Sequence, residues 1–219
     1  AEGVKIGFEN VDGLVADLGG GSLELAKVEN NLITNKTSLP LGVLRLINNP
    51  IVKKRNLSKY IKNLFADEKW LSKKKFKNLY LVGGTWRALF KLHLFQNDHP
   101  VHIIHQYSID NERLKKFLDK ISSFNKSKLK TVEYISKSRT QYLPYSSIIL
   151  NEIMNFTNPK KILCSISGLR EGALVKEHFK DLESPDMFNK SLEHIAKKRG
   201  DLGLTFKKYY DFIKPVFEG

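Results

Sequence analysis

The chain reads Asp17-Leu18-Gly19-Gly20-Gly21-Ser22-Leu23-Glu24 directly after the apolar run 14–16. An apolar run of strand length that ends in an acid, three glycines and a hydroxyl predicts a buried strand followed by a tight turn without side chains. Backbone N–H groups in such a turn can point at a phosphate, and an acid at the strand end can hold a divalent cation. The same stretch also fits a glycine-rich hairpin turn, because short glycine motifs occur without any ligand.

The segments around this stretch predict a three-stranded meander. Strand-like runs occupy residues 14–18, 23–28 and 32–39. Asn30 and Asn31 separate the last two runs, and Asn tolerates the positive φ that a tight hairpin needs. The glycine stretch therefore joins the first and second strands.

A second glycine-rich turn follows a later strand. The apolar run 79–82 passes through Gly83, Gly84 and Thr85 straight into helical sequence. The N–H groups at a helix N-terminus and the helix dipole both favour an anion there. Each turn alone could serve packing only, but two such turns after two buried strands favour one ligand held from two sides.

The order of elements predicts the fold class. The meander is followed by a helix, the strand 79–82, further helices, a last strand at 162–166 and a helix that begins near the turn 167–172. This order predicts an α/β fold with a mixed five-stranded sheet flanked by helices, because a doubly wound parallel sheet would need a crossover helix after every strand. Ser108-Ile109-Asp110 is interpreted as a helix cap. Residues 187–219 are predicted to be a helical C-terminal extension, which gives a first domain at 1–182 and a second region at 183–219.

Composition limits the partners and the compartment. There are 37 Lys and Arg against 23 Asp and Glu, a net charge of +14, which attracts polyanions such as polyphosphate, nucleotides, nucleic acid or anionic lipid. A solvated lysine surface without a specific ligand is the alternative. Cys164 is the single cysteine, so an intrachain disulfide is excluded. No 18-residue apolar stretch and no secretory signal are present, which predicts a cytoplasmic protein without a membrane partner.

Three histidines spaced by three residues also suggest a metal site, namely His99, His102 and His105. Pro100 excludes a helix that would bring them to one face, and no nearby acid completes a ligand set. We therefore expect no metal at these histidines.

Four segments resemble one family closely, the exopolyphosphatase and guanosine pentaphosphate phosphohydrolase family. The segments lie at 13–25, 38–46, 82–89 and 167–172, in the same order as in the family, and the resemblance covers residues 1 to 180. It implies a ribonuclease-H-like half-domain of the kind shared by actin-like ATPases, sugar kinases and acetate kinases. Its implied activity is hydrolysis of a terminal phosphoanhydride of inorganic polyphosphate or of the alarmone pppGpp, which belongs to the stringent response. Nucleic acid is then not an expected partner, and the full-length protein is expected to be a homodimer.

The resemblance also implies the site residues and a Mg²⁺ cofactor. Asp17 and Glu24 are the implied catalytic and metal-binding carboxylates, with Glu24 orienting the metal or the attacking water. The implied phosphate-binding residues are Gly19, Gly20, Gly21, Ser22, Gly83, Gly84, Thr85, Arg45 and Arg170. Arg170 fits a structural ion pair equally well.

One departure from the family affects the expected activity. Family members carry a preceding half-domain and a catalytic Glu in a segment that aligns just before Ala1, and Glu2 does not match it. We therefore expect this polypeptide to be a second half-domain with little activity alone. Two other functions stay open, a kinase-like phosphotransferase domain that binds ATP and a non-enzymatic polyanion-binding module. The sequence does not decide between polyphosphate and pppGpp.

Overall fold

The computed structural model describes residues 1–8, 10–49, 52–71, 76–125, 127–128 and 135–178, and five positions close to the C-terminus, 208, 211, 212, 214 and 215. The predicted boundary at 182/183 lies outside the described residues, and so does nearly all of the predicted helical extension at 187–219. Within the described part, none of the helices combines the length and the apolar character that a membrane crossing requires.

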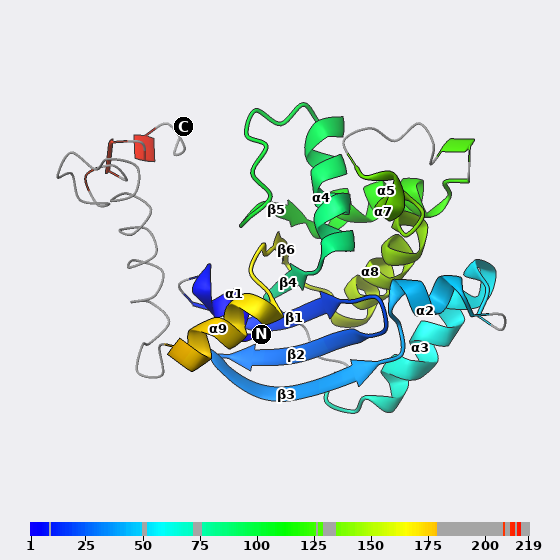
Figure 1. Cartoon of the computed structure of the whole chain (residues 1–219), viewed down its shortest axis with the longest axis horizontal. Coiled ribbons are helices and arrows are strands. Elements are labelled where there is room, and N and C mark those ends of the chain that lie inside the picture. The colour runs from blue at the N-terminus through cyan, green and yellow to red at the C-terminus, as the bar shows by residue number, and fades with distance from the viewer. Residues whose placement is uncertain are drawn as a thin grey trace.

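A mixed six-stranded sheet forms the centre of the molecule (Figure 1). Its strands are β1 (Gly13–Leu18), β2 (Leu23–Glu29), β3 (Leu32–Leu39), β4 (Asn78–Val82), β5 (Ser108–Asp110) and β6 (Lys161–Cys164), in the order β3-β2-β1-β4-β6-β5. The first three strands are antiparallel neighbours, and β1, β4 and β6 run parallel. The carboxyl ends of β1, β4 and β6 therefore meet at one edge.

The sheet has one strand more than the sequence predicted. Residues 108–110 pair with β6 as a short antiparallel edge strand before they enter the following helix. The predicted cap is also present, because the Asp110 carboxylate accepts a hydrogen bond from the Arg113 N–H. Three residues are too few to show the alternation by which a strand is recognised.

The meander follows the prediction closely. Asn30 and Asn31 both have positive φ, 49° and 63°, and connect β2 to β3. Asn31 also fixes the start of β1, because its side-chain oxygen accepts from the Val11 N–H at 2.7 Å. The predicted Asn-Asn hairpin is thus confirmed.

Helices cover the two faces of the sheet unequally (Figure 1). They are α1 (Glu2–Ile6), α2 (Val43–Ile47), α3 (Leu57–Asp67), α4 (Gly84–Gln96), α5 (Asn111–Ser122), α7 (Lys137–Thr140), α8 (Leu143–Thr157) and α9 (Leu169–His178), with the 3-10 turn η1 (Lys54–Asn56). The large core lies between the sheet and the helices from α2 to α8, whereas a smaller cluster of Val and aromatic side chains lies beneath α1. Helix α9 packs against α1 on this second face.

Strand β1 is buried on both faces, and its alternation decides where its acid points. Leu14, Ala16 and Leu18 enter the large core, and Val15 enters the smaller cluster. Because successive side chains alternate across a strand, Asp17 lies on the same face as Val15, the face that carries α1 and α9.

Candidate functional site

The glycine stretch forms the turn between β1 and β2. Leu18 pairs with Leu23, and the Gly19 N–H donates to the Ser22 carbonyl at 3.0 Å, which closes the turn. Of the four backbone donors predicted for a phosphate, Gly19 is therefore already used. The N–H groups of Gly20, Gly21 and Ser22 have no protein acceptor within the described residues.

The first N–H groups of helix α2 hold the turn by donating hydrogen bonds to carbonyl groups of the turn. The Val43 N–H donates to the Gly19 carbonyl at 3.2 Å, and the N–H groups of Leu44 and Arg45 donate to the Gly20 carbonyl at 3.0 and 3.1 Å. In a trans peptide the C=O and the next N–H point in opposite directions. The N–H groups of Gly20 and Gly21 consequently point away from α2, as donors for an anion must.

Gly42 makes this contact with α2 possible. A Cβ atom on Gly42 would lie 2.2 Å from the Gly21 carbonyl carbon and 2.3 Å from both the Gly20 oxygen and the Ser22 nitrogen. All three are backbone atoms of the turn, so no side-chain rotation could relieve the clash. The absence of a side chain at Gly42 thus allows the turn to lie directly against the start of α2.

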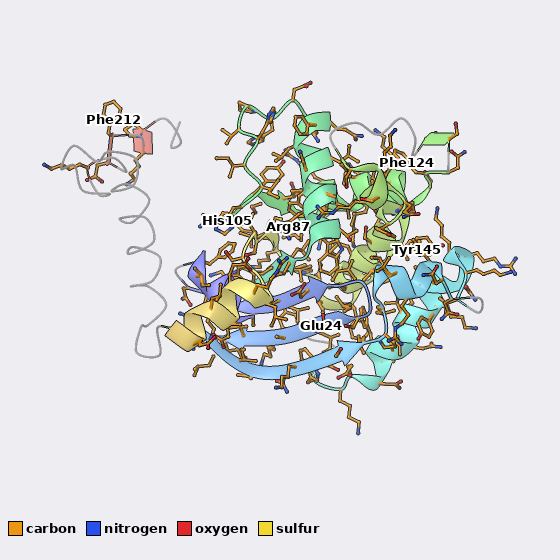
Figure 2. The ribbon with its side chains drawn as sticks, in the orientation of Figure 1. Glu24, Arg87, His105, Phe124, Tyr145 and Phe212 are labelled. Atoms are coloured by element: carbon orange, nitrogen blue, oxygen red, sulfur yellow. The ribbon has the colours of Figure 1, made fainter. Side chains whose placement is uncertain are left out.

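Asp17 and Glu24 lie directly opposite one another in the β1–β2 register. Directly opposite side chains in an antiparallel pair project on the same face with Cβ atoms about 5 Å apart. Glu24 is exposed and accepts hydrogen bonds from the Ser22 hydroxyl and, at 3.2 Å, from the Ser38 hydroxyl. Figure 2 shows Glu24 on β2, beside β1.

Burial raises the pKa of Asp17 above its ordinary value, and the nearby Glu24 carboxylate raises it further. The amino group of Ala1 and the Arg87 guanidinium oppose this and lower the Asp17 pKa. Two close carboxylates that repel one another are stabilised by a cation between them.

The donor set fits a hard divalent cation such as Mg²⁺. Mg²⁺ prefers oxygen ligands and is commonly held by one or two carboxylates together with waters and substrate phosphates. The described residues contain no group of three or more His, Cys, Asp or Glu side chains that could hold a metal by themselves. Asp17 and Glu24 could therefore hold Mg²⁺ only together with waters and substrate phosphates as further ligands.

The second glycine-rich turn lies at the same edge of the sheet. Val82 pairs with Asp17 in the parallel β1–β4 ladder, so Gly83 follows beside the β1 terminus. Gly83 has φ 115°, a conformation that favours glycine, and a Cβ there would lie 2.5 Å from the Leu18 carbonyl and 3.3 Å from the Asp17 carboxylate. Helix α4 then begins at Gly84, and its first N–H groups face the same edge.

The two predicted arginines lie in different surroundings. Arg45 Nε donates to the Gly21 carbonyl at 2.9 Å, so this side chain supports the turn. Arg170 is exposed on the first turn of α9 and forms no ion pair among the described residues, apart from its electrostatic effect on Glu171. The structural ion pair considered for Arg170 is therefore not seen in the described part of the chain.

Two further arginines at the site were missed by the sequence analysis. Arg139, on α7, places its guanidinium over Gly84, because a Cβ on Gly84 would lie 3.2 Å from Arg139 Cζ. Arg87, on the first turn of α4, donates to the Ile166 carbonyl at 3.4 Å, and its Nε is buried without a partner. No sequence pattern indicated Arg139 as a site residue, because it lies in a basic and polar stretch without apolar periodicity.

Arg139 lies beside the N-terminus of α4. The N-terminus of a helix carries partial positive charge, so a cation beside it is repelled. An anion between the guanidinium and the α4 N–H groups would remove this repulsion. The site thus combines backbone donors, an exposed guanidinium and a carboxylate pair, the groups that position and neutralise a phosphoanhydride next to a divalent cation.

Comparison with known proteins identifies a family and similar folds. The sequence profile described as the Ppx/GppA phosphatase family matches residues 1–180. No curated protein matches the chain significantly. An exopolyphosphatase from Cytophaga hutchinsonii has a similar structure, with TM-score 0.73, 18% identity, and coverage of 84% of this chain and 62% of its own. A Ppx/GppA family member from Aquifex aeolicus has TM-score 0.66, 21% identity, and coverage of 83% and 63%.

These likenesses confirm the predicted fold, an α/β half-domain of the actin-like ATPase type. The chain covers less than two thirds of the length of either solved structure.

Proposed function

The chain belongs to the Ppx/GppA phosphatase family, and from this premise we propose that it forms the phosphate-binding part of a phosphohydrolase. The proposed reaction releases the terminal phosphate of inorganic polyphosphate or of pppGpp. One observation supports it most: Asp17 and Glu24 are cross-strand partners beside a turn whose N–H groups point away from α2. A cation site and an anion site therefore adjoin, as phosphoryl transfer requires.

Each group has a defined role in this proposal. The N–H groups of Gly20, Gly21 and Ser22 bind the terminal phosphate from one side, and those at Gly84 and Thr85 bind it from the other. Arg139 neutralises phosphate charge at the α4 N-terminus. Asp17 and Glu24 would hold Mg²⁺, which when bound neutralises charge on the phosphate oxygens. Gly19 and Arg45 support the turn from within the protein.

The charge balance favours the longer of the two substrates. With a net charge of +14, the protein attracts a chain of many phosphates more strongly than one nucleotide. We therefore propose inorganic polyphosphate as the first substrate to test and pppGpp as the second.

We expect the 219-residue chain to bind inorganic tripolyphosphate in the presence of Mg²⁺ and to release little phosphate from it. The residues that bind are present, whereas the solved relatives contain additional chain that this polypeptide does not cover. Calorimetry would measure binding and a phosphate assay would measure turnover. Rapid phosphate release by this chain alone would contradict the requirement for the additional part.

Two controls separate the rival functions. Tight binding of ATP together with no binding of tripolyphosphate would favour a phosphotransferase. Glu24→Gln should weaken Mg²⁺-dependent tripolyphosphate binding by about tenfold, which corresponds to roughly 1.4 kcal/mol. If Glu24→Gln binds normally and affinity depends only on salt concentration, the protein is a polyanion-binding module instead.

A further inference from the structure

The turn between β6 and α9, residues 165–168, is the third turn at the edge of the sheet that carries the site. The N–H groups at both ends of this turn donate to groups of the protein itself. The Ser165 N–H donates to the Leu81 carbonyl at 2.9 Å, and the Gly168 N–H donates to the Glu171 carboxylate at 2.7 Å. This turn therefore differs from the β1–β2 turn, where the N–H groups of Gly20 and Gly21 point away from α2.

Two side chains from other elements hold the peptide groups of Ile166. Its N–H donates to His105 Nδ1 at 3.4 Å, and its carbonyl accepts from Arg87 Nη1 at 3.4 Å. The Ile166 side chain is 47% exposed, so burial of that side chain does not fix the turn. The polar contacts of His105 and Arg87 hold the middle of the turn, and those of Ser165 and Gly168 hold its two ends. Figure 2 shows Arg87 beside the first turn of α4 and His105 at the loop that leads to β5.

His105 is itself held in place on its other sides. Its ring packs edge-on against Phe8 with a centroid distance of 5.4 Å, and a Cβ on Gly7 would lie 2.4 Å from the ring. The next residue, Gln106, donates through its side chain to the Gly7 carbonyl at 2.7 Å and through its N–H to the Cys164 carbonyl at 2.9 Å. The ring is thus a rigid acceptor for the Ile166 N–H.

The turn leads directly into the first turn of α9, which carries Arg170. Leu169 is 80% exposed and Arg170 is also exposed, so burial of these side chains does not fix the start of α9. A Cβ on Gly168 would lie 2.9 Å from the Val82 side chain, and Val82 pairs with Asp17, which places this end of α9 near the carboxylate pair. A shift of the Ile166 peptide would move Arg170 relative to that pair.

We propose that His105 and Arg87 are positioning residues that hold the β6–α9 turn so that Arg170 can bind substrate phosphate. This inference rests on the proposed function, because it assigns Arg170 to the same phosphate. Neither His105 nor its neighbours Gly7 and Phe8 belong to the groups assigned to the phosphate. His105 therefore acts on the substrate only through the turn.

The decisive variant is His105→Phe, studied at pH 7.5. Phe keeps an aromatic ring against Phe8 but has no acceptor for the Ile166 N–H. We expect tripolyphosphate binding in the presence of Mg²⁺ to weaken by about three- to tenfold, the range for one net hydrogen bond. We also expect faster hydrogen exchange at the Ile166 amide. His105→Gln offers a side-chain oxygen as acceptor and should restore most of the affinity and protection.

A double-mutant comparison tests whether the effect passes through Arg170. Arg170→Ala should weaken binding, and adding His105→Phe to it should cause no further loss. Arg87→Lys, which keeps the charge but not the forked geometry, should increase Ile166 exchange in the same way as His105→Phe. Thermal unfolding of each variant shows whether it is folded.

The possible outcomes are distinct. Unchanged Ile166 exchange in His105→Phe overturns the positioning role, and so does an equal further loss of affinity in the Arg170→Ala background. If the wild-type chain binds no tripolyphosphate, the proposed function fails and the role of Arg170 fails with it. In that case the exchange of the Ile166 amide still shows whether His105 holds the turn.

Discussion

Asp17→Asn is expected to abolish most Mg²⁺-dependent tripolyphosphate binding and yet to raise the unfolding temperature at pH 7. The first effect follows from the proposed role, because an amide oxygen carries no net charge for the cation. We expect at least about a tenfold loss of affinity, equivalent to roughly 1.4 kcal/mol. The second effect follows from the surroundings of Asp17 in the folded protein.

The direction of the stability effect can be derived from the pKa. Burial and then Glu24 raise the pKa of folded Asp17 above its ordinary value of 3.8. A raised carboxylate pKa means that folding favours the protonated form. Its contribution to stability is present below pH 3.8 and is lost as the pH rises through the folded pKa. Asn imitates the neutral form, so the variant avoids this loss at pH 7.

Thermal unfolding at several pH values would measure the effect. We expect the variant to unfold at a higher temperature by about 2–4 °C for each kcal/mol gained at pH 7, and the difference to vanish at acid pH. Asp67→Asn is a matched control, because Asp67 is exposed at the end of α3. An unchanged affinity for Mg²⁺ and tripolyphosphate in Asp17→Asn would refute its role as a ligand.

Gly42→Ala is expected to damage both the fold and the binding turn. Gly42 has φ −64° and ψ 141°, which alanine adopts without strain, so the effect is entirely steric. The added methyl group would overlap backbone atoms of the turn at 2.2–2.3 Å. Overpacking of this kind typically costs about 1–3 kcal/mol, and here the relief must come from moving the turn away from α2.

Gly21→Ala provides the matched comparison. A Cβ on Gly21 meets no atom within 4 Å, so stability should be unchanged or slightly higher. The methyl group would nevertheless stand where we place the phosphate, and tripolyphosphate binding should weaken. Denaturant unfolding and calorimetry on both variants would separate the effects. Full stability and normal binding in Gly42→Ala would show that the turn does not depend on its close contact with Gly42 at the start of α2.

The parts of the fold that could be predicted are those with strong local chemistry. The β1–β2–β3 meander follows from alternating apolar runs separated by residues that tolerate positive φ, such as Asn30 and Asn31. The two glycine-rich turns converge because β1 and β4 are parallel. Each turn follows the carboxyl end of its strand, and parallel strands have these ends at the same edge of the sheet. The meander depends on residues close together in the chain, and each strand with its glycine-rich turn is also a local pattern.

The parts that could not be predicted depend on contacts between distant segments. Arg139 reaches Gly84 across more than fifty residues, and no spacing in the sequence indicates this approach. The Ile166 peptide is held by Arg87 and His105 from two other elements. The use of the Gly19 N–H inside the turn also depends on turn geometry, because the sequence cannot tell which glycine closes the hairpin.

The register of the first hairpin has an evolutionary consequence. Leu18 pairs with Leu23 and Asp17 pairs with Glu24. We therefore expect the residue types of the connecting segment to vary more freely than its length. As long as the turn keeps its present geometry, one inserted or deleted residue would shift the β2 register, turn its later side chains to the opposite face and separate the two acids. In divergent related proteins, we expect the number of residues between this aspartate and this glutamate to be conserved even where the glycines between them are replaced.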